Sequence, residues 1–168
     1  MPGTGPAWWR HLWWFFPIVA AGVVTAVLLW PKAPPVPQAR HYLDASACLL
    51  TDPGGVAAGS PGAPVWAAME SASLASHVMV SYLYDTGPSD VTPMLNTLMQ
   101  RQCGVIITAG APSGVVIAAA KANPHQRFLL VLAAGWSAAK APPNAAVVST
   151  AAAAARIGQA IHALAAQA

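Results

Sequence analysis

Two glycine-containing loops carry the residues of this chain that could bind a polar molecule. One loop reads Asp-Pro-Gly-Gly from Asp52 to Gly55, and the other reads Gly-Ala-Pro-Ser-Gly at positions 110–114. The Asp52 carboxylate could accept hydrogen bonds from a hydroxyl or an amine. The backbone of Gly110 and the Ser113 hydroxyl, at a predicted helix start, could contact a polar or anionic group. The same residue types are common in turns and helix caps, and spacing alone favours that structural interpretation.

The sequence offers no constellation of residues for catalysis or metal binding. The second loop is not a nucleophile elbow because Ala111 stands in place of the first glycine, and it does not match the glycine-rich nucleotide loops. The histidines lack the spacing of metal ligands, and the two cysteines do not form a C-x-x-C pair. Asp85 and Asp90 bracket a loop, where turn roles are favoured over an acid/base pair. We therefore predict that the chain is not an enzyme and uses no metal or cofactor.

Short apolar runs alternate with helical stretches from residue 42 onward. The patterns predict five buried strands, at residues 47–51, 78–84, 105–109, 128–132 and 146–149. They predict helices at residues 65–76, 90–102, 113–122 and 151–166. Such alternation predicts an α/β fold, a doubly wound parallel five-stranded sheet in the order 2-1-3-4-5 with helices on both faces. The loops after strands one and three then meet at the carboxyl edge of the sheet, where ligands bind in this fold class.

The two cysteines lie close to neighbouring strands of this predicted sheet. Cys48 opens the first strand and Cys103 directly precedes the third. Adjacent strands lie roughly 4.8 Å apart, which is within the Cα separation that a disulfide tolerates. A Cys48–Cys103 disulfide is therefore predicted, with two buried free thiols as the alternative. The disulfide would suit an exported domain.

The first forty residues differ in composition from the rest. Residues 13–30 contain no charge, and tryptophans lie at both ends of this segment. A helix of this length spans roughly 27 Å, close to the hydrocarbon thickness of a bilayer, and its tryptophans would form an interfacial belt. We predict a transmembrane helix, with a cleaved signal peptide as the alternative. The prediction divides the chain into a cytoplasmic segment (1–12), the helix (13–30), a proline-rich linker (31–41) and one domain (42–168).

The distribution of charge excludes one class of partner. The chain carries a formal net charge of +3, but after residue 40 five basic residues balance five acidic ones. A nucleic-acid-binding domain needs a clustered basic face, so no nucleic-acid partner is expected. The charges that flank residues 13–30 do not decide the orientation in the membrane. The short N-terminus and the cysteines favour an extracytoplasmic domain.

Five segments, in order and at fitting intervals, resemble the basic membrane protein (PnrA-like) family of ABC-transporter substrate-binding lipoproteins. They are residues 48–55 (CLLTDPGG), 60–69, 105–110 (VIITAG), 120–131 and 144–149 (NAAVVS). The resemblance implies the first lobe of a type I periplasmic-binding fold. It carries over Asp52 and Gly110 as ligand-site residues, and Ser60 because it matches the first residue of a family motif. An extracytoplasmic location is implied as well.

The chain also departs from the pattern of that family. Family members have two lobes that close on a nucleoside-like ligand, whereas this sequence matches only the first. Pro61 and Gly62 replace a phenylalanine and an asparagine that contact ligand, and Leu132 stands where the fourth strand of the family ends in an aspartate. No lipobox cysteine is present, so the predicted transmembrane helix would replace the lipid anchor.

The expected function combines these observations. We predict a single-pass protein of the cell membrane whose extracytoplasmic domain binds a small polar, nucleoside-like ligand for ABC uptake or sensing. An ABC permease or a sensor protein is the expected partner. The predicted ligand-binding residues are Asp52, Gly55, Ser60, Gly110 and Ser113. The alternative is a lobe that has lost ligand binding and acts as a protein-protein interaction module at the membrane.

Overall fold

The computed structural model describes residues 41–132 and 141–168. The predicted membrane span at residues 13–30 and nearly all of the linker lie outside these ranges. None of the helices in the described ranges is long and apolar enough to cross a bilayer. The described residues, 41–132 and 141–168, belong to one compact unit.

A parallel sheet of five strands forms the centre of this unit. The strands are β1 (Ser46–Thr51), β2 (Met79–Tyr84), β3 (Val105–Ala109), β4 (Arg127–Leu132) and β5 (Ala145–Ser149). Their order is β2-β1-β3-β4-β5, and every neighbouring pair is parallel. The predicted topology is therefore confirmed. Each predicted strand lies within one residue of its observed bounds.

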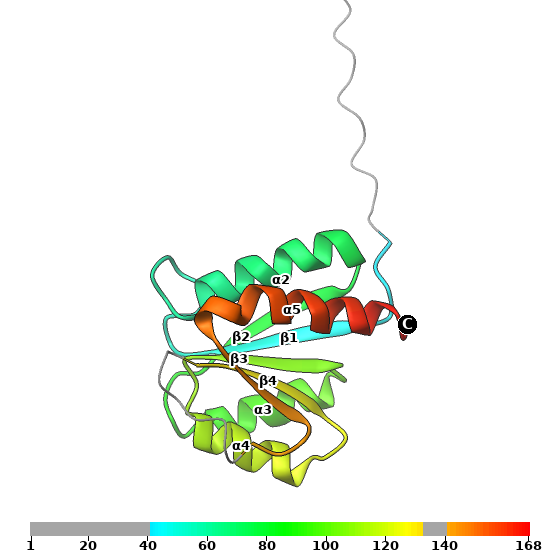
Figure 1. The fold of residues 1–168 in the computed structure, drawn as a ribbon. Coiled ribbons are helices and arrows are strands. Elements are labelled where there is room, and N and C mark those ends of the chain that lie inside the picture. The colour runs from blue at the N-terminus through cyan, green and yellow to red at the C-terminus, as the bar shows by residue number, and fades with distance from the viewer. Residues whose placement is uncertain (1–40, 133–140) are drawn as a thin grey trace, which may run out of the picture. The chain divides into compact units, whose positions relative to one another are not determined.

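Helices cover both faces of the sheet. Helices α2 (Gly62–Ser76) and α5 (Thr150–Ala165) lie on one face, and α3 (Val91–Gln100) and α4 (Ser113–Ala122) lie on the other (Figure 1). Helix α2 begins at Gly62, three residues before the predicted start at residue 65. Pro64 is tolerated there because the amides of a first helical turn lack intrahelical partners.

Alternating side chains of the central strands build the two halves of the hydrophobic core. Along β1, Ala47 and Leu49 pack in the cluster that α2 and α5 cover, and Cys48 and Leu50 pack in the cluster that α3 and α4 cover. All four side chains are at most 1% exposed. This two-sided burial explains why the strands read as continuous apolar runs rather than as alternating ones.

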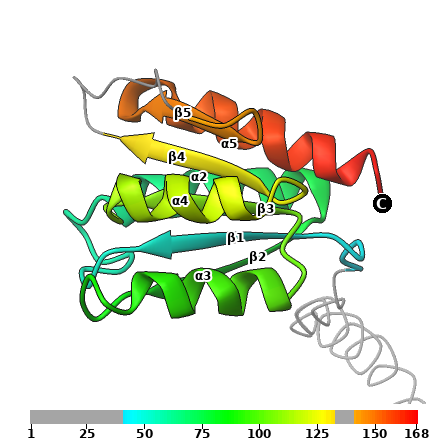
Figure 2. The ribbon, with the colours of Figure 1, turned by 90° about the horizontal axis from the view of Figure 1, so that it is seen from below.

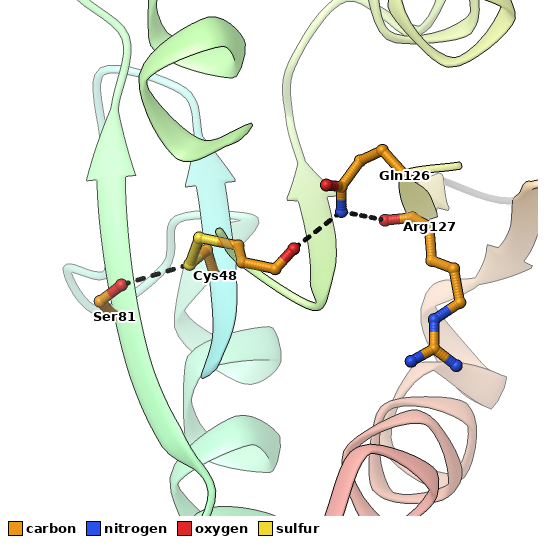
Figure 3. Close-up of a disulfide and its surroundings, with 5 residues drawn as sticks. Cys48, Ser81, Gln126 and Arg127 are labelled. Atoms are coloured by element: carbon orange, nitrogen blue, oxygen red, sulfur yellow. Dashed lines mark hydrogen bonds between the residues drawn. A yellow bond between two sulfur atoms is a disulfide. The ribbon is translucent and has the colours of Figure 1, made fainter. Parts of the chain in front are cut away.

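Cys48 and Cys103 form the predicted disulfide, with their Cα atoms 5.8 Å apart. Both residues are at most 2% exposed, so the bond lies inside the core between the sheet and α3. The Ser81 hydroxyl lies 3.5 Å from the Cys48 sulfur, and the Gln126 side-chain amide donates to the Cys103 carbonyl at 2.9 Å (Figure 3). The alternative of two free thiols is therefore wrong for this structure.

Candidate functional site

An open pocket of about 720 Å³ lies at the carboxyl edge of the sheet. Its walls are the loop before α2 (59–61), the β3–α4 connection with the start of α4 (109–114), the end of β4 (131–132) and Thr150 at the start of α5. In Figure 2 the arrowheads of β1 and β4 point to the end of the molecule at which α4 and α5 begin. The pocket therefore occupies the crevice that the topology predicts for ligand binding.

Three of the five predicted ligand-binding residues line this pocket. They are Ser60, Gly110 and Ser113. Asp52 and Gly55 do not line it, although both belong to the adjacent loop after β1. The structure thus brings the two predicted loops together, but it divides their residues between the pocket wall and the loop interior.

Asp52 lies behind Gly110 and stabilises its own turn. Its Oδ1 atom accepts hydrogen bonds from the Gly54 amide at 3.1 Å and from the Thr51 hydroxyl at 3.2 Å. Its Oδ2 atom packs so closely against Gly110 that a Cβ there would approach it to 2.9 Å, and Gly110 has a φ of +80°. Gly110 is therefore required both by its backbone conformation and by the carboxylate behind it.

Gly55 and Ser60 hold the neighbouring loop in shape. Gly55 is buried with a φ of +58°, and its carbonyl accepts hydrogen bonds from the Thr51 hydroxyl at 3.0 Å and the Ser60 hydroxyl at 2.8 Å. The Ser60 oxygen also accepts a hydrogen bond from the Ala63 amide at 3.2 Å. Ser60 thus joins the loop to the first turn of α2 while one side of it faces the pocket.

Ser113 is the predicted residue that is best placed to contact a ligand. It is the first residue of α4, it follows Pro112, and it is 6% exposed where it lines the pocket. Thr150, which lines the pocket from the start of α5, was not among the predicted site residues. The pair Ser149-Thr150 before an alanine-rich helix was the available signal, because hydroxyl residues favour helix starts.

A buried carboxyl group lies beside the pocket-forming loops. Asp85 follows β2, is 4% exposed, and its backbone amide donates to the Thr51 carbonyl at 2.9 Å. Burial raises the pKa of Asp85 above its ordinary value of 3.8, and the negative charges of Asp52 and Asp90 raise it further. Within the described ranges, no group of three or more metal-ligating side chains could hold a metal ion.

Asp85→Asn is expected to stabilise the fold at neutral pH and to have no such effect in acid. Because the pKa of Asp85 is raised by folding, its favourable contribution is present below pH 3.8 and is lost as the pH rises through the folded-state pKa. Asparagine does not titrate, so the variant lacks this loss. Urea unfolding of the two proteins from pH 3.5 to pH 7 measures the difference. Parallel pH profiles for wild type and variant would contradict the expectation.

Comparisons with known proteins support the fold assignment. No family model and no curated protein matches the chain. A fragment of a candidate lipoprotein from Peptoclostridium difficile 630 matches with a TM-score of 0.60 and 18% identity, covering 73% of this chain and 98% of that one. An ABC transporter solute-binding protein from Aeropyrum pernix K1 matches with a TM-score of 0.53 and 19% identity. That match covers 61% of this chain and only 28% of the solute-binding protein.

A third solved structure with a similar fold is named for an enzyme and not for a binding protein. A 3-dehydroquinate dehydratase-like protein from Bifidobacterium longum matches with a TM-score of 0.50 and 10% identity, covering 73% of this chain and 96% of that one. At these identities the likenesses describe the fold and not the activity. The domain therefore has a doubly wound α/β fold that a solute-binding protein and a dehydratase-like protein share.

Proposed function

We propose that the chain is a membrane-anchored, extracytoplasmic binding protein whose domain takes a small polar ligand into the pocket at the carboxyl edge of the sheet. The observation that carries the proposal is the pocket itself. Its volume of about 720 Å³ lies within the range of roughly 300–1,000 Å³ that small-molecule sites occupy. It also contains three of the residues at which a ligand was expected from the sequence.

Several observations support the remaining parts of the proposal. The charge-free segment at residues 13–30 has the length and the flanking tryptophans of a membrane anchor. The buried Cys48–Cys103 disulfide is typical of a domain that folds outside the cytoplasm. The motif resemblance and the likeness to a solute-binding protein favour uptake or sensing, with an ABC permease or a sensor protein as partner. A nucleoside-like ligand of the basic membrane protein family is the first candidate, and no catalytic role is proposed.

The openness of the site sets an expectation for affinity. The match covers 28% of the solute-binding protein, and the pocket at the sheet edge of this chain is open to solvent. Good small-molecule sites bury about 70–90% of the ligand surface. One open lobe covers less, so we expect weak binding by the lobe alone and tighter binding when a partner covers the pocket.

Gly114→Leu is expected to abolish ligand binding without unfolding the protein. A Cβ on Gly114 would meet no atom within 4 Å, and the residue lines the pocket, so a leucine there projects into open space. Thermal unfolding of the full-length protein with a panel of nucleosides, sugars and amino acids measures binding. A ligand at 100 times its Kd stabilises the folded state by about 2.7 kcal/mol, and this stabilisation should be lost in the variant.

Gly158→Leu provides the matched control. Gly158 also lies inside a helix, and a Cβ added to it would likewise meet no atom within 4 Å, but it is in α5 and does not line the pocket. This variant should respond to ligands as the wild type does. An unchanged response of Gly114→Leu would place the binding site elsewhere and contradict the proposal.

A protein-interaction module is the second candidate, and one feature favours it. The edge strand β2 exposes Met79, Tyr82 and Tyr84 by 45%, 40% and 52%, and Trp66 of α2 packs edge-on against Tyr82 with ring centroids 5.1 Å apart. Exposed apolar side chains on an edge strand are typical of a surface that contacts another protein. Thermal unfolding with the panel of nucleosides, sugars and amino acids distinguishes the two functions. A protein-interaction module should be stabilised by none of these compounds.

A further inference from the structure

The charged side chains of the domain are divided between the two edges of the sheet. Three basic residues lie at the amino edge, where the strands begin: Arg101 follows α3, Lys121 lies in the last turn of α4, and Arg127 opens β4. All three side chains are exposed. Among the described residues, Asp44 before β1 is the one acidic residue at this edge. The amino edge therefore carries a net positive charge.

The carboxyl edge, which holds the pocket, carries the opposite charge. Asp52 follows β1, and Asp85 and Asp90 follow β2. No basic residue stands between β1, β2 or β3 and the helix that follows it. Glu70 and Arg156 lie within α2 and α5, away from both edges. The basic and acidic residues after residue 40 balance in number, but the fold separates them in space.

The basic residues of the amino edge are not fully explained by helix stability. Arg101 and Lys121 lie at helix C-termini, where a positive charge is favourable. Arg127 belongs to a strand, and its guanidinium donates to the Gly104 carbonyl at 3.4 Å and to the Gln167 side-chain oxygen at 3.1 Å. Both acceptors are neutral. These contacts therefore hold Arg127 at the amino edge without cancelling its charge.

The chain enters the domain at this same edge. In Figure 2 the first described residues lie at the end of the domain opposite the strand arrowheads. The Leu43 amide donates to the His77 carbonyl at 2.8 Å, which fixes the entry beside the end of α2. Ten residues, 31–40, separate the predicted membrane span from the first described residue, and a chain of this length reaches at most about 36 Å. A membrane anchor would therefore hold the amino edge nearest to the bilayer.

Two exposed apolar side chains accompany the basic residues at the amino edge. Tyr42 precedes β1 and Met79 opens β2, and they are 48% and 45% exposed. The Met79 amide donates to the Ala45 carbonyl at 3.0 Å, so the segments that carry both side chains are hydrogen-bonded neighbours. Tyrosine favours the interface between lipid and water. Basic and apolar side chains on one surface are the combination that contacts anionic lipid.

We propose that the amino edge of the domain docks on the anionic lipid surface of the membrane that anchors the chain. The docking surface consists of Tyr42, Met79, Arg101, Lys121 and Arg127. The tether makes this contact intramolecular, at an effective concentration on the order of millimolar, so a few charges are enough to favour it. The reverse orientation is disfavoured because the acidic carboxyl edge would be repelled by anionic lipid.

Docking in this orientation keeps the pocket away from the bilayer. The strands contain five or six residues, so the pocket edge lies roughly 17–20 Å from the docked edge. This distance exceeds the Debye length of about 8 Å at physiological salt, and the pocket opens toward ligands in solution. The inference rests on the membrane anchor of the proposed function and adds a lipid-binding surface to it.

Quenching by labelled lipids tests the contact in the full-length protein. The chain is reconstituted in vesicles of phosphatidylcholine, alone or mixed with phosphatidylglycerol, that contain lipids with a nitroxide on the headgroup. A dye is attached at an exposed position, through His125→Cys at the amino edge or Pro88→Cys at the carboxyl edge. The native cysteines are buried in their disulfide and do not take the dye. Quenching should be stronger at position 125 than at position 88, and stronger on anionic lipid, and high salt should remove the effect of lipid charge.

Charge-removing variants separate docking from stability. Arg101→Gln, Lys121→Gln and Arg127→Gln are combined in one protein. Because one basic residue near an anionic surface changes the docking equilibrium about fivefold, the triple variant should weaken docking about a hundredfold and lose the extra quenching. Arg156→Gln is the matched control, since Arg156 is exposed within α5, and it should behave as the wild type does. Thermal unfolding verifies the fold, and Arg127→Gln alone, with an expected fivefold loss, is used if the triple variant unfolds.

The outcomes distinguish this inference from the proposed function. Equal quenching on neutral and anionic lipid, in a protein that resists extraction by alkaline carbonate, would overturn the docking surface and leave the anchor intact. Quenching that depends on protein density and not on lipid charge would indicate a second copy or another protein at this edge and would also overturn it. If alkaline carbonate releases the protein from the vesicles, the anchor of the proposed function fails together with the inference.

Discussion

Replacing both Cys48 and Cys103 by alanine is expected to lower the free energy of unfolding by about 4 kcal/mol, on a chain-entropy estimate for a loop of this length. The two cysteines are 55 residues apart in the sequence, so the disulfide restricts a large part of the unfolded chain. It ties β1 to the segment that leads into β3, and these neighbouring strands carry the two loops that meet beside the pocket. Denaturant unfolding of the wild type and the double variant measures the difference.

The reducing agent supplies an internal control for this prediction. A reductant should destabilise the wild type toward the level of the double variant, and it should leave the double variant unchanged. Reduction requires unfolding or local opening, because both cysteines are at most 2% exposed. A double variant within about 1 kcal/mol of the wild type would show that the disulfide contributes much less than the chain-entropy estimate.

Asn144→Asp is expected to cost about 3 kcal/mol through the loss of hydrogen bonds to backbone carbonyls. The Asn144 Nδ2 group lies 2.9, 2.9 and 2.8 Å from the carbonyl oxygens of Ala120, Asn123 and Gln126, so its two N–H donors are shared among three acceptors. It thereby fastens the end of α4 and the start of β4 to the strand that follows, β5. An ionised carboxylate has nearly the same shape but no donor, so its oxygens would face three carbonyl oxygens.

Asn123→Asp is the matched control for this substitution. Asn123 lies in the connection between α4 and β4, which Asn144 contacts. The side-chain amide of Asn123 donates to one carbonyl, that of Ala119, at 2.8 Å. The same chemical change there should cost about 1 kcal/mol, since the side-chain amide of Asn123 contacts one carbonyl whereas that of Asn144 contacts three. Chemical unfolding at pH 7 compares the two variants. Equal losses would mean that the three contacts of Asn144 are not what stabilises the connection.

Neither Asn144 nor Asn123 lines the proposed ligand pocket. The shape of the loop beside the pocket depends instead on residues that have little or no side chain. Gly62 shows how tightly the adjoining loop is built, because a Cβ there would lie 2.3 Å from the Gly55 carbonyl oxygen and 2.8 Å from the Thr51 hydroxyl. In the structure, glycine at that position is what allows α2 to start against the loop after β1.

The order of the strands and the position of the crevice could be predicted because they follow from local patterns. Each strand is a short apolar run and each helix has its own start and stop signals, so the alternation is visible without any contact. Right-handed crossovers then leave few arrangements of a parallel sheet. The Cys48–Cys103 disulfide could be proposed once the first and third strands were neighbours, but the alternative of free thiols was excluded only by the folded geometry.

The roles of individual loop residues could not be predicted in the same way. Asp52 had the chemistry of a ligand contact, yet its carboxylate accepts hydrogen bonds from Thr51 and Gly54 and packs behind Gly110. Ser113, in contrast, is held at the pocket wall by the start of α4. The direction of a loop side chain depends on competition between nearby hydrogen-bond partners, and that competition is decided only when both loops are in place.

The α/β alternation, the sheet order and the edge at which the two glycine-containing loops meet follow from periodicity and chain connectivity, so they could be predicted from the residues alone. The folded structure was needed to show that Ser60, Gly110 and Ser113 line the pocket while Asp52 and Gly55 stabilise the turn beside it. It also revealed Thr150 in the wall and three helix N-termini around one cavity. These features arise from segments far apart in the chain, whose approach is set by packing and not by any local pattern.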